Sequence, residues 1–168
     1  GQNTSSEFDA QSGHAGQPGR AVCPQGDADS NGNCSSAGDG PAAARFADLI
    51  ARMDDLQLGL VAEIRPGLPY EDLHELAHVR LAELGRACGL LRGGVEELVE
   101  RGVTRALLPH GLGHSLGITV HDVGCKPHAP RPANPFLRMT AVIEPGQVFT
   151  IEPGLYFIES LLAPLRSG

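Results

Sequence analysis

Apolar residues recur with helical spacing in two stretches of the first half of the chain. Between residues 45 and 64 they are separated by aspartate and arginine, which is the pattern of an amphipathic helix. The sequence RPGLP at 65–69 predicts the end of that helix, because proline and glycine interrupt helical hydrogen bonding. A second helix is predicted from about Tyr70 to Gly89. Its apolar face consists of Leu73, Leu76, Ala77, Leu81 and Leu84.

The second half of the chain shows a different pattern, in which glycine and proline separate short runs of β-type residues. Residues 92–105 are expected to form a short helical or irregular connector. The runs GITVH, TAVI, QVFTI and LYFI follow, and branched or aromatic residues of this kind favour strands. Two helices followed by a set of antiparallel strands predict an α+β domain.

Residues 1–44 differ from the rest of the chain in composition. They are dominated by Gly, Ser, Asn, Gln, Asp and Ala and contain almost no branched aliphatic residues. Such a segment buries too little apolar surface to offset the entropy lost on ordering it. We therefore expect a low-complexity, disordered segment over 1–44 and a folded domain over 45–168.

Overall composition excludes several classes of protein. The 168 residues are 41% hydrophobic, which suffices for about one domain. The net charge of −7 argues against nucleic acid and against a membrane surface as partners. We find no apolar run of about 18 residues that would span a membrane and no signal-peptide pattern. Four cysteines without a CxxC pair indicate a reduced, cytoplasmic protein.

The second predicted helix contains HELAH at 74–78, which matches the HExxH pattern of zinc proteases. On a helix, His74 and His78 lie one turn apart and could share a metal ion, with Glu75 as the base. Relative to the apolar face, however, both histidines fall at the edge of the helix or on its solvent side. The continuation VRLAEL offers no clear third ligand. We interpret the two histidines as surface residues rather than as a zinc site.

A denser group of histidines occupies HGLGHSLGITVHD at 110–122. Its glycines allow the backbone to approach an ion or a substrate closely. His114 is a candidate metal ligand, and His110 and His121 are candidate hydrogen-bonding groups in the same cavity. A metal site for hydrolysis also needs oxygen ligands. Glu152, before the Pro-Gly turn of VFTIEPGLYF, is the candidate, whereas Glu144 in the earlier IEPG is expected to be exposed.

Two blocks of sequence resemble a known family. PHGLGHSLGITVHDVG at 109–124 and FLRMTAVIEPGQVFTIEPGLYFIESLLAPLR at 136–166 are similar in content and spacing to the catalytic domain of bacterial Xaa-Pro dipeptidases, or prolidases. The resemblance extends from about Arg45 to the last residue. It implies the pita-bread fold shared with methionine aminopeptidase and aminopeptidase P, in which helices back a curved antiparallel sheet. We expect a partial pita-bread fold here.

The resemblance also implies roles for the candidate residues. His114 and Glu152 match ligands of a centre of two divalent metal ions, usually manganese. His121 matches a histidine that contacts the substrate and steadies the tetrahedral intermediate, and His110 matches a second histidine near the reacting carbonyl. Arg138 matches an arginine that anchors the substrate or its proline carboxylate. The implied reaction is hydrolysis of Xaa-Pro dipeptides by metal-activated water in a cytoplasmic homodimer.

The chain also departs from the family pattern. The family centre includes two aspartates eleven positions apart before the first helix, and a last glutamate that is expected beyond Gly168. No two aspartates in 1–44 have the required spacing. We therefore expect this chain, as an incomplete part of a parent enzyme, to be inactive alone. The aspartates in question are Asp9, Asp27, Asp29 and Asp39.

Two alternatives stay open at this point. The first 44 residues are either the product of a reading-frame error or a genuine extension. The chain is either part of an active enzyme, or a metal-free pita-bread binding module or degenerate remnant. The joint presence of all five candidate residues favours descent from an enzyme, because a binding module has no reason to keep them together.

Overall fold

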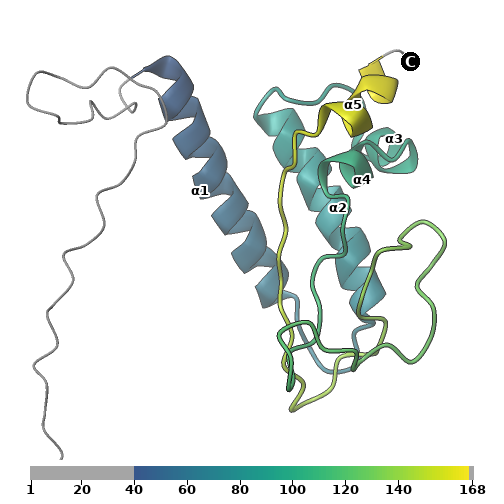
Figure 1. The fold of residues 1–168 in the computed structure, drawn as a ribbon. Coiled ribbons are helices and arrows are strands. Elements are labelled where there is room, and N and C mark those ends of the chain that lie inside the picture. The colour runs from purple at the N-terminus through teal and green to yellow at the C-terminus, as the bar shows by residue number, and fades with distance from the viewer. Residues whose placement is uncertain (1–39, 167–168) are drawn as a thin grey trace, which may run out of the picture. The chain divides into compact units, whose positions relative to one another are not determined.

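A computed structural model describes residues 40–166 of the chain. The expectations for residues 1–39, including those for the four aspartates, lie outside this range. The described part contains five helices joined by extended and irregular segments (Figure 1). They are α1 (Pro41–Ala62), α2 (Tyr70–Ala87), α3 (Val95–Glu100), α4 (Val103–Leu107) and α5 (Glu159–Arg166).

The first helix begins earlier than its apolar pattern predicts, at Pro41 rather than near Arg45. Proline is well accepted in the first turn of a helix, where its missing N–H has no helical partner to lose. Three alanines follow it, and alanine has the highest helix propensity. The helix propensity of these residues therefore accounts for the first turn. Hydrophobic periodicity does not predict it, because the turn has no apolar pattern.

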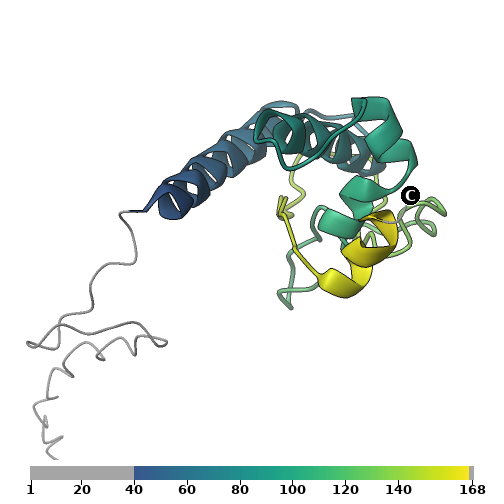
Figure 2. The same ribbon diagram turned by 90° about the horizontal axis from the view of Figure 1, so that it is seen from above.

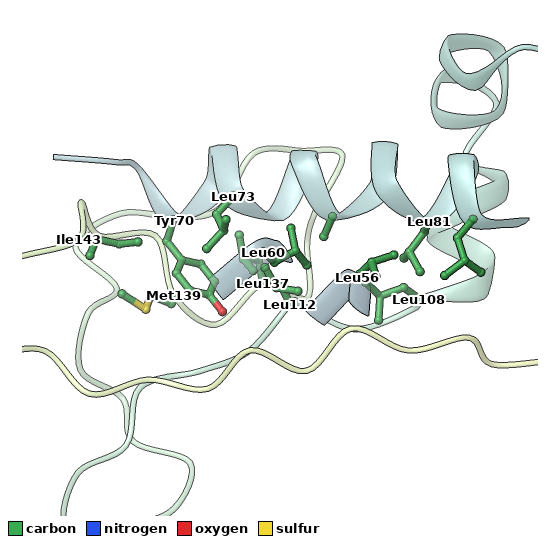
Figure 3. Packing of buried hydrophobic residues seen from close by; sticks show 12 residues of the cluster. Leu56, Leu60, Tyr70, Leu73, Leu81, Leu108, Leu112, Leu137, Met139 and Ile143 are labelled. Atoms are coloured by element: carbon green, nitrogen blue, oxygen red, sulfur yellow. The ribbon is translucent and has the colours of Figure 1, made fainter. Parts of the chain in front are cut away.

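One apolar core joins α1 and α2 to segments from the second half of the chain. In Figure 3 the side chains of Tyr70, Leu73 and Leu81 on α2 point toward residues of α1 and of the extended segments. Figure 2 shows α1 and α2 from above, with the later helices on the other side of α2. The buried cluster consists of Leu56, Leu60, Tyr70, Leu73, Ala77, Leu81, Leu84, Leu108, Leu112, Leu137, Met139 and Ile143.

The fully buried residues that α1 contributes to this core lie in its C-terminal half, and Leu49 and Met53 pack against the edge of the core. Leu56 and Leu60 are buried, whereas Phe46 is 63% exposed and Ile50 is 55% exposed. The other described residues therefore cover only part of the apolar face predicted for α1, and its N-terminal part is exposed. Within residues 40–166, no helix has both the length and the apolarity needed to cross a membrane.

The turn between α1 and α2 is anchored to the TAVI run. Gly67 has φ of +89°, a left-handed conformation that glycine adopts without steric cost. Its N–H donates to the carbonyl of Ile143, and Ile143 N–H donates to the carbonyl of Leu68. Tyr70 N–H donates to the carbonyl of Ala141. These bonds hold the first turn of α2 against residues 141–143.

The prediction of antiparallel strands is wrong for the described residues. Residues 40–166 contain two isolated antiparallel bridges, Pro69–Val142 and Ser115–Phe149, and no longer strand. Residues 112–116 and 148–152 do run antiparallel: Leu112 and His114 accept backbone hydrogen bonds, and Leu116 donates one. Among the described residues no third segment extends this pair into a sheet. The Pro-Gly steps at 145–146 and 153–154 limit its length.

The remaining two predicted strands have other conformations. Within GITVH, Gly117 N–H donates to the carbonyl of Thr119, and Ile118 and Val120 are exposed in an open loop. LYFI is an extended segment that leads into α5, an element that our sequence analysis did not assign. The connector predicted over 92–105 contains α3 and most of α4. Among the described residues the fold is therefore largely helical, with paired extended segments rather than strands.

Candidate functional site

His114 is held through both its backbone and its ring. Its N–H donates to Oγ1 of Thr150 at 3.0 Å, and its carbonyl accepts from Thr150 N–H at 2.9 Å. The ring Nδ1 lies 3.0 Å from the carbonyl oxygen of Ser115, an acceptor that assigns the ring proton to Nδ1. The Nε2 atom then carries the lone pair that can coordinate a metal ion.

Glu152 lies directly across from that lone pair. Its Oε1 atom is 3.1 Å from His114 Nε2, and its side chain is 47% exposed whereas that of His114 is 6% exposed. The antiparallel pairing brings the two residues together, because Glu152 N–H donates to the carbonyl of Leu112 at 2.7 Å. Gln57 on α1 donates to the carbonyl of Ile151 at 2.6 Å. The segment that carries the carboxylate is therefore fastened on two sides.

A cavity of about 220 Å³ collects the candidate residues. They come from separate segments of the chain, between residues 110 and 152, and the fold brings every one of them to the same cavity wall. Phe136 and two glycines complete the lining. The candidate residues in the lining are His110, His114, His121, Arg138 and Glu152.

The loop that carries His121 is closed by hydrogen bonds at its base. Ser115 Oγ donates to the carbonyl of Gly124 at 2.9 Å, and Asp122 N–H donates to the carbonyl of Ser115 at 3.2 Å. The ring of His121 is thereby brought to 4.4 Å from the ring of His114, centroid to centroid, with the planes at 75°. His121 is exposed, so a molecule in the cavity can reach it.

His110 and Arg138 differ in how firmly they are held. His110 Nδ1 lies 2.7 Å from the carbonyl oxygen of Gly111, and its ring packs edge-on against Tyr156 at 5.0 Å. Arg138 is exposed, and its guanidinium has no ion-pair partner among residues 40–166. A free guanidinium at the rim of a cavity is suited to bind a carboxylate with two parallel hydrogen bonds.

The sequence did not identify the residues that contact the backbone of Thr150 and so hold the segment next to Glu152 in place. The hydroxyl of Tyr70 donates to the carbonyl of Thr150 at 2.9 Å, and burial, together with the nearby charge of Glu152, raises the pKa of Tyr70 above its usual value. A Cβ atom at Gly113 would overlap both that carbonyl and the hydroxyl. Gly113 and Thr150 do lie inside the two blocks of family resemblance, which is the signal that could have identified them. Tyr70 carries no local signal.

The donor atoms present suit part of a metal centre. An imidazole nitrogen and a carboxylate oxygen are ligands that divalent first-row metal ions accept. Two donors 3.1 Å apart can both reach one ion at the usual bond length of about 2.1 Å. Within the described range, no cluster of three or more His, Cys, Asp or Glu residues could hold a metal ion. His114 and Glu152 therefore provide a partial ligand set.

The interpretation of His74 and His78 as surface residues is wrong. They are 2% and 1% exposed, respectively, because residues 105–111 and 133–137 cover the flank of α2 that a helical wheel leaves open. The carboxylate of Glu75 forms an ion pair with Arg105, whose Nη2 atom lies 2.9 Å from Glu75 Oε2. The side-chain amide of Asn134 donates to the same carboxylate.

Comparison with known proteins defines the class of protein. The model of Metallopeptidase family M24 matches residues 35–166, so the chain belongs to this family. This result confirms the resemblance found in the sequence. With the helices and paired segments described above, it makes the structure a partial pita-bread-like fold.

The curated relatives are more specific. The chain is 52% identical over 131 residues to an Xaa-Pro dipeptidase of Marinobacter nauticus, covering 77% of this chain and 30% of that protein. It is also 52% identical over 130 residues to an Xaa-Pro dipeptidase of Aeromonas hydrophila, covering 73% of this chain and 30% of that protein. The chain thus spans about 30% of the length of these relatives.

Solved structures show the same fold. The aminopeptidase PepP of Pseudomonas aeruginosa superimposes with a TM-score of 0.55 at 28% identity, covering 71% of this chain and 25% of that one. Zinc-substituted aminopeptidase P of Escherichia coli, in complex with product, superimposes with a TM-score of 0.55 at 27% identity, covering 73% and 25%.

Proposed function

We propose that this chain carries the metal-binding and dipeptide-binding part of an Xaa-Pro dipeptidase active site. The observation that best supports the proposal is the gathering of five chemically suited residues around one cavity. The identity of 52% to two Xaa-Pro dipeptidases supports the substrate class. Because the chain spans about 30% of those relatives, the activity is proposed for a protein of their full length.

The proposed substrate explains the type of residue at each position. The amide before proline has no N–H, so recognition must depend on the carbonyl and on the ends of the dipeptide. Arg138 binds the carboxylate of the proline residue. His110 and His121 contact the scissile carbonyl and stabilise negative charge as it develops on the oxygen. These roles use the exposed faces of the three side chains.

His114 and Glu152 hold a divalent metal ion in this proposal, and the complete enzyme holds two such ions, by resemblance manganese. Metal ions in such a site lower the pKa of water and polarise the carbonyl. With two ligands identified, we expect little or no hydrolysis by the 168-residue chain alone. A cytoplasmic homodimer belongs to the proposal as well, and the free thiols of Cys88 and Cys125 fit a reducing compartment.

A chimera tests the proposal directly. Residues 45–166 replace the matching segment of the Marinobacter nauticus enzyme, and hydrolysis of Leu-Pro is measured with Mn²⁺ present. We expect the chimera to be active and the 168-residue chain to show almost no turnover. His121→Ala in the chimera should lower kcat by about 10²-fold or more, the range typical of a group that acts on the reacting carbonyl.

Matched changes distinguish the outcomes. Arg138→Ala should raise KM for Leu-Pro more than it lowers kcat, because the carboxylate keeps its charge throughout the reaction and is bound equally in the ground state and the transition state. His128→Ala is the control, since His128 is exposed and lies outside the cavity, and we expect wild-type kinetics. A folded but inactive chimera that still binds dipeptides would contradict the proposal and support the metal-free binding module.

A further inference from the structure

A second pair of metal-ligating side chains lines a neighbouring cavity, which shares His110, Gly111 and Phe136 with the cavity described above. His74 and His78 lie one turn apart on α2, and their Nε2 atoms are 3.2 Å from each other. Their ring centroids are 4.6 Å apart, with the planes at 73°. Both rings line a partly open cavity of about 250 Å³, through which small molecules can reach the histidine pair.

The separation of the two nitrogens matches a shared metal ion. Imidazole nitrogens that bind Zn²⁺ tetrahedrally at about 2.1 Å are about 3.4 Å from each other. The observed distance of 3.2 Å therefore needs no rearrangement of the helix. The i,i+4 spacing on a rigid helix keeps both rings on one side of α2, which removes most of the entropy cost of bringing two ligands together.

The protonation of the two rings is compatible with coordination. Burial lowers the pKa of both histidines well below the usual value, so both rings are neutral near pH 7. Neither Nδ1 atom has a hydrogen-bond partner among the described residues, so no donor prevents these atoms from carrying the ring proton. Each Nε2 atom can then present a lone pair.

Without a metal ion, one Nε2–H donates to the other Nε2 atom across the 3.2 Å contact. The two Nδ1 atoms are buried without partners among the described residues. They are not the coordinating atoms, so an ion at Nε2 would leave them as they are.

The surroundings limit this site to binding. In a zinc protease of HExxH type, Glu75 would act as the base on bound water. Here Arg105 and Asn134 occupy its carboxylate, so no base faces the pair. The remaining coordination positions of an ion would be taken by water in the cavity.

We propose that His74 and His78 bind one divalent ion of the type that favours imidazole, namely Cu²⁺, Ni²⁺ or Zn²⁺, at a site separate from His114 and Glu152. By the general order of stability, Cu²⁺ binds most tightly of the three. The site would link two successive turns of α2 and does not take part in hydrolysis. It is independent of the dipeptidase proposal.

The test uses the 168-residue chain, stripped of metal with EDTA and titrated with Cu²⁺ and with Zn²⁺ in a calorimeter. His78→Phe should abolish one equivalent of binding or weaken it by at least about tenfold, the loss typical when a metal site is disrupted. Glu152→Gln and His128→Ala should leave that equivalent intact. Full retention of stoichiometry and affinity in a folded His78→Phe variant would overturn the proposal.

A measurement on the unchanged protein covers the case in which the variant fails to fold. Nitrogen-15 histidine spectra recorded during addition of Zn²⁺ should show two Nε2 resonances moving together to the metal-bound range, with one ion per chain. Electron paramagnetic resonance with one equivalent of Cu²⁺ should show coupling to two imidazole nitrogens. Zinc-independent resonances for both buried histidines would overturn the proposal without any substitution.

Discussion

The Nε2 atom of His114 lies 3.1 Å from Oε1 of Glu152, across the antiparallel pairing of residues 112–116 with 148–152. Two backbone hydrogen bonds flank this contact, one from Thr150 N–H to His114 and one from Glu152 N–H to Leu112. The backbone therefore sets the distance between the two side chains before any ion binds. A preorganised pair of this kind loses less entropy on coordination than two mobile side chains would.

We expect Glu152→Gln to weaken Mn²⁺ binding by the 168-residue chain at least about tenfold, because an amide oxygen carries no charge to attract the cation. Stability should change by less than about 0.5 kcal/mol, since the side chain is half exposed. Isothermal titration calorimetry and urea unfolding measure the two quantities. Glu144→Gln is the matched control, because Glu144 is exposed and precedes the other Pro-Gly step. Equal affinities for the two variants would contradict a role for Glu152 as a ligand.

Tyr70→Phe should reduce the free energy of unfolding by about 1–2 kcal/mol, because the partly buried carbonyl of Thr150 loses its hydrogen bond from the hydroxyl. Tyr156→Phe should change it by less than about 0.5 kcal/mol, since the Tyr156 ring is half exposed and its hydroxyl has no protein partner among the described residues. Urea titration followed by circular dichroism compares the two. A similar loss in both variants would show that the Tyr70 hydroxyl does not support the site.

A pair of glycine substitutions separates close packing from helix propensity. Gly113→Ala should destabilise the fold by about 2 kcal/mol or more, because its Cβ would overlap the backbone of Thr150. Gly59→Ala should stabilise it by about 0.5–1 kcal/mol, since Gly59 lies within α1 and the nearest atom to its added Cβ, Arg80 Nη1, is 3.7 Å away. Thermal melting of both variants should give shifts of opposite sign. A stable Gly113→Ala variant would contradict the close approach at that position.

The buried histidines predict a loss of stability in mild acid. Burial holds the pKa of His74 at about 4 in the folded chain, and burial with the neighbouring His74 lowers the pKa of His78 further. Between pH 6.5 and about 4 the unfolded chain binds protons that the folded chain does not. The free energy of unfolding therefore decreases as the pH is lowered, by up to about 1.4 kcal/mol per pH unit for each histidine.

Urea unfolding from pH 7.5 to 5 in the presence of EDTA measures this slope, with metal ions excluded. His78→Phe should make the slope shallower because one titrating group is removed, whereas His128→Ala should leave it unchanged because His128 is exposed. If the wild-type slope persists in His78→Phe, other groups account for the acid sensitivity.

Local patterns were sufficient for part of this protein. The approximate positions of α1 and α2 follow from apolar periodicity and from the Pro-Gly step at 66–67. This is possible because helical hydrogen bonds form within one segment, so the side chains of that segment carry the pattern that predicts the helix. Family membership was also readable, since the two blocks around His114 and Glu152 keep their residues in order. The chemical identities of the five candidate residues are properties of the sequence alone.

Tertiary structure decided the rest, because it depends on which segments meet. The β-type runs were recognisable, but a strand needs a neighbour. Within residues 40–166 the pairings are short, joining 67–70 to 141–143 and 112–116 to 148–152. His74 and His78 were interpreted from the sequence as surface residues but are buried, since residues distant in sequence cover the side of α2 that carries them. The gathering of His110, His121 and Arg138 around the His114–Glu152 pair likewise results from long-range packing that no local pattern specifies.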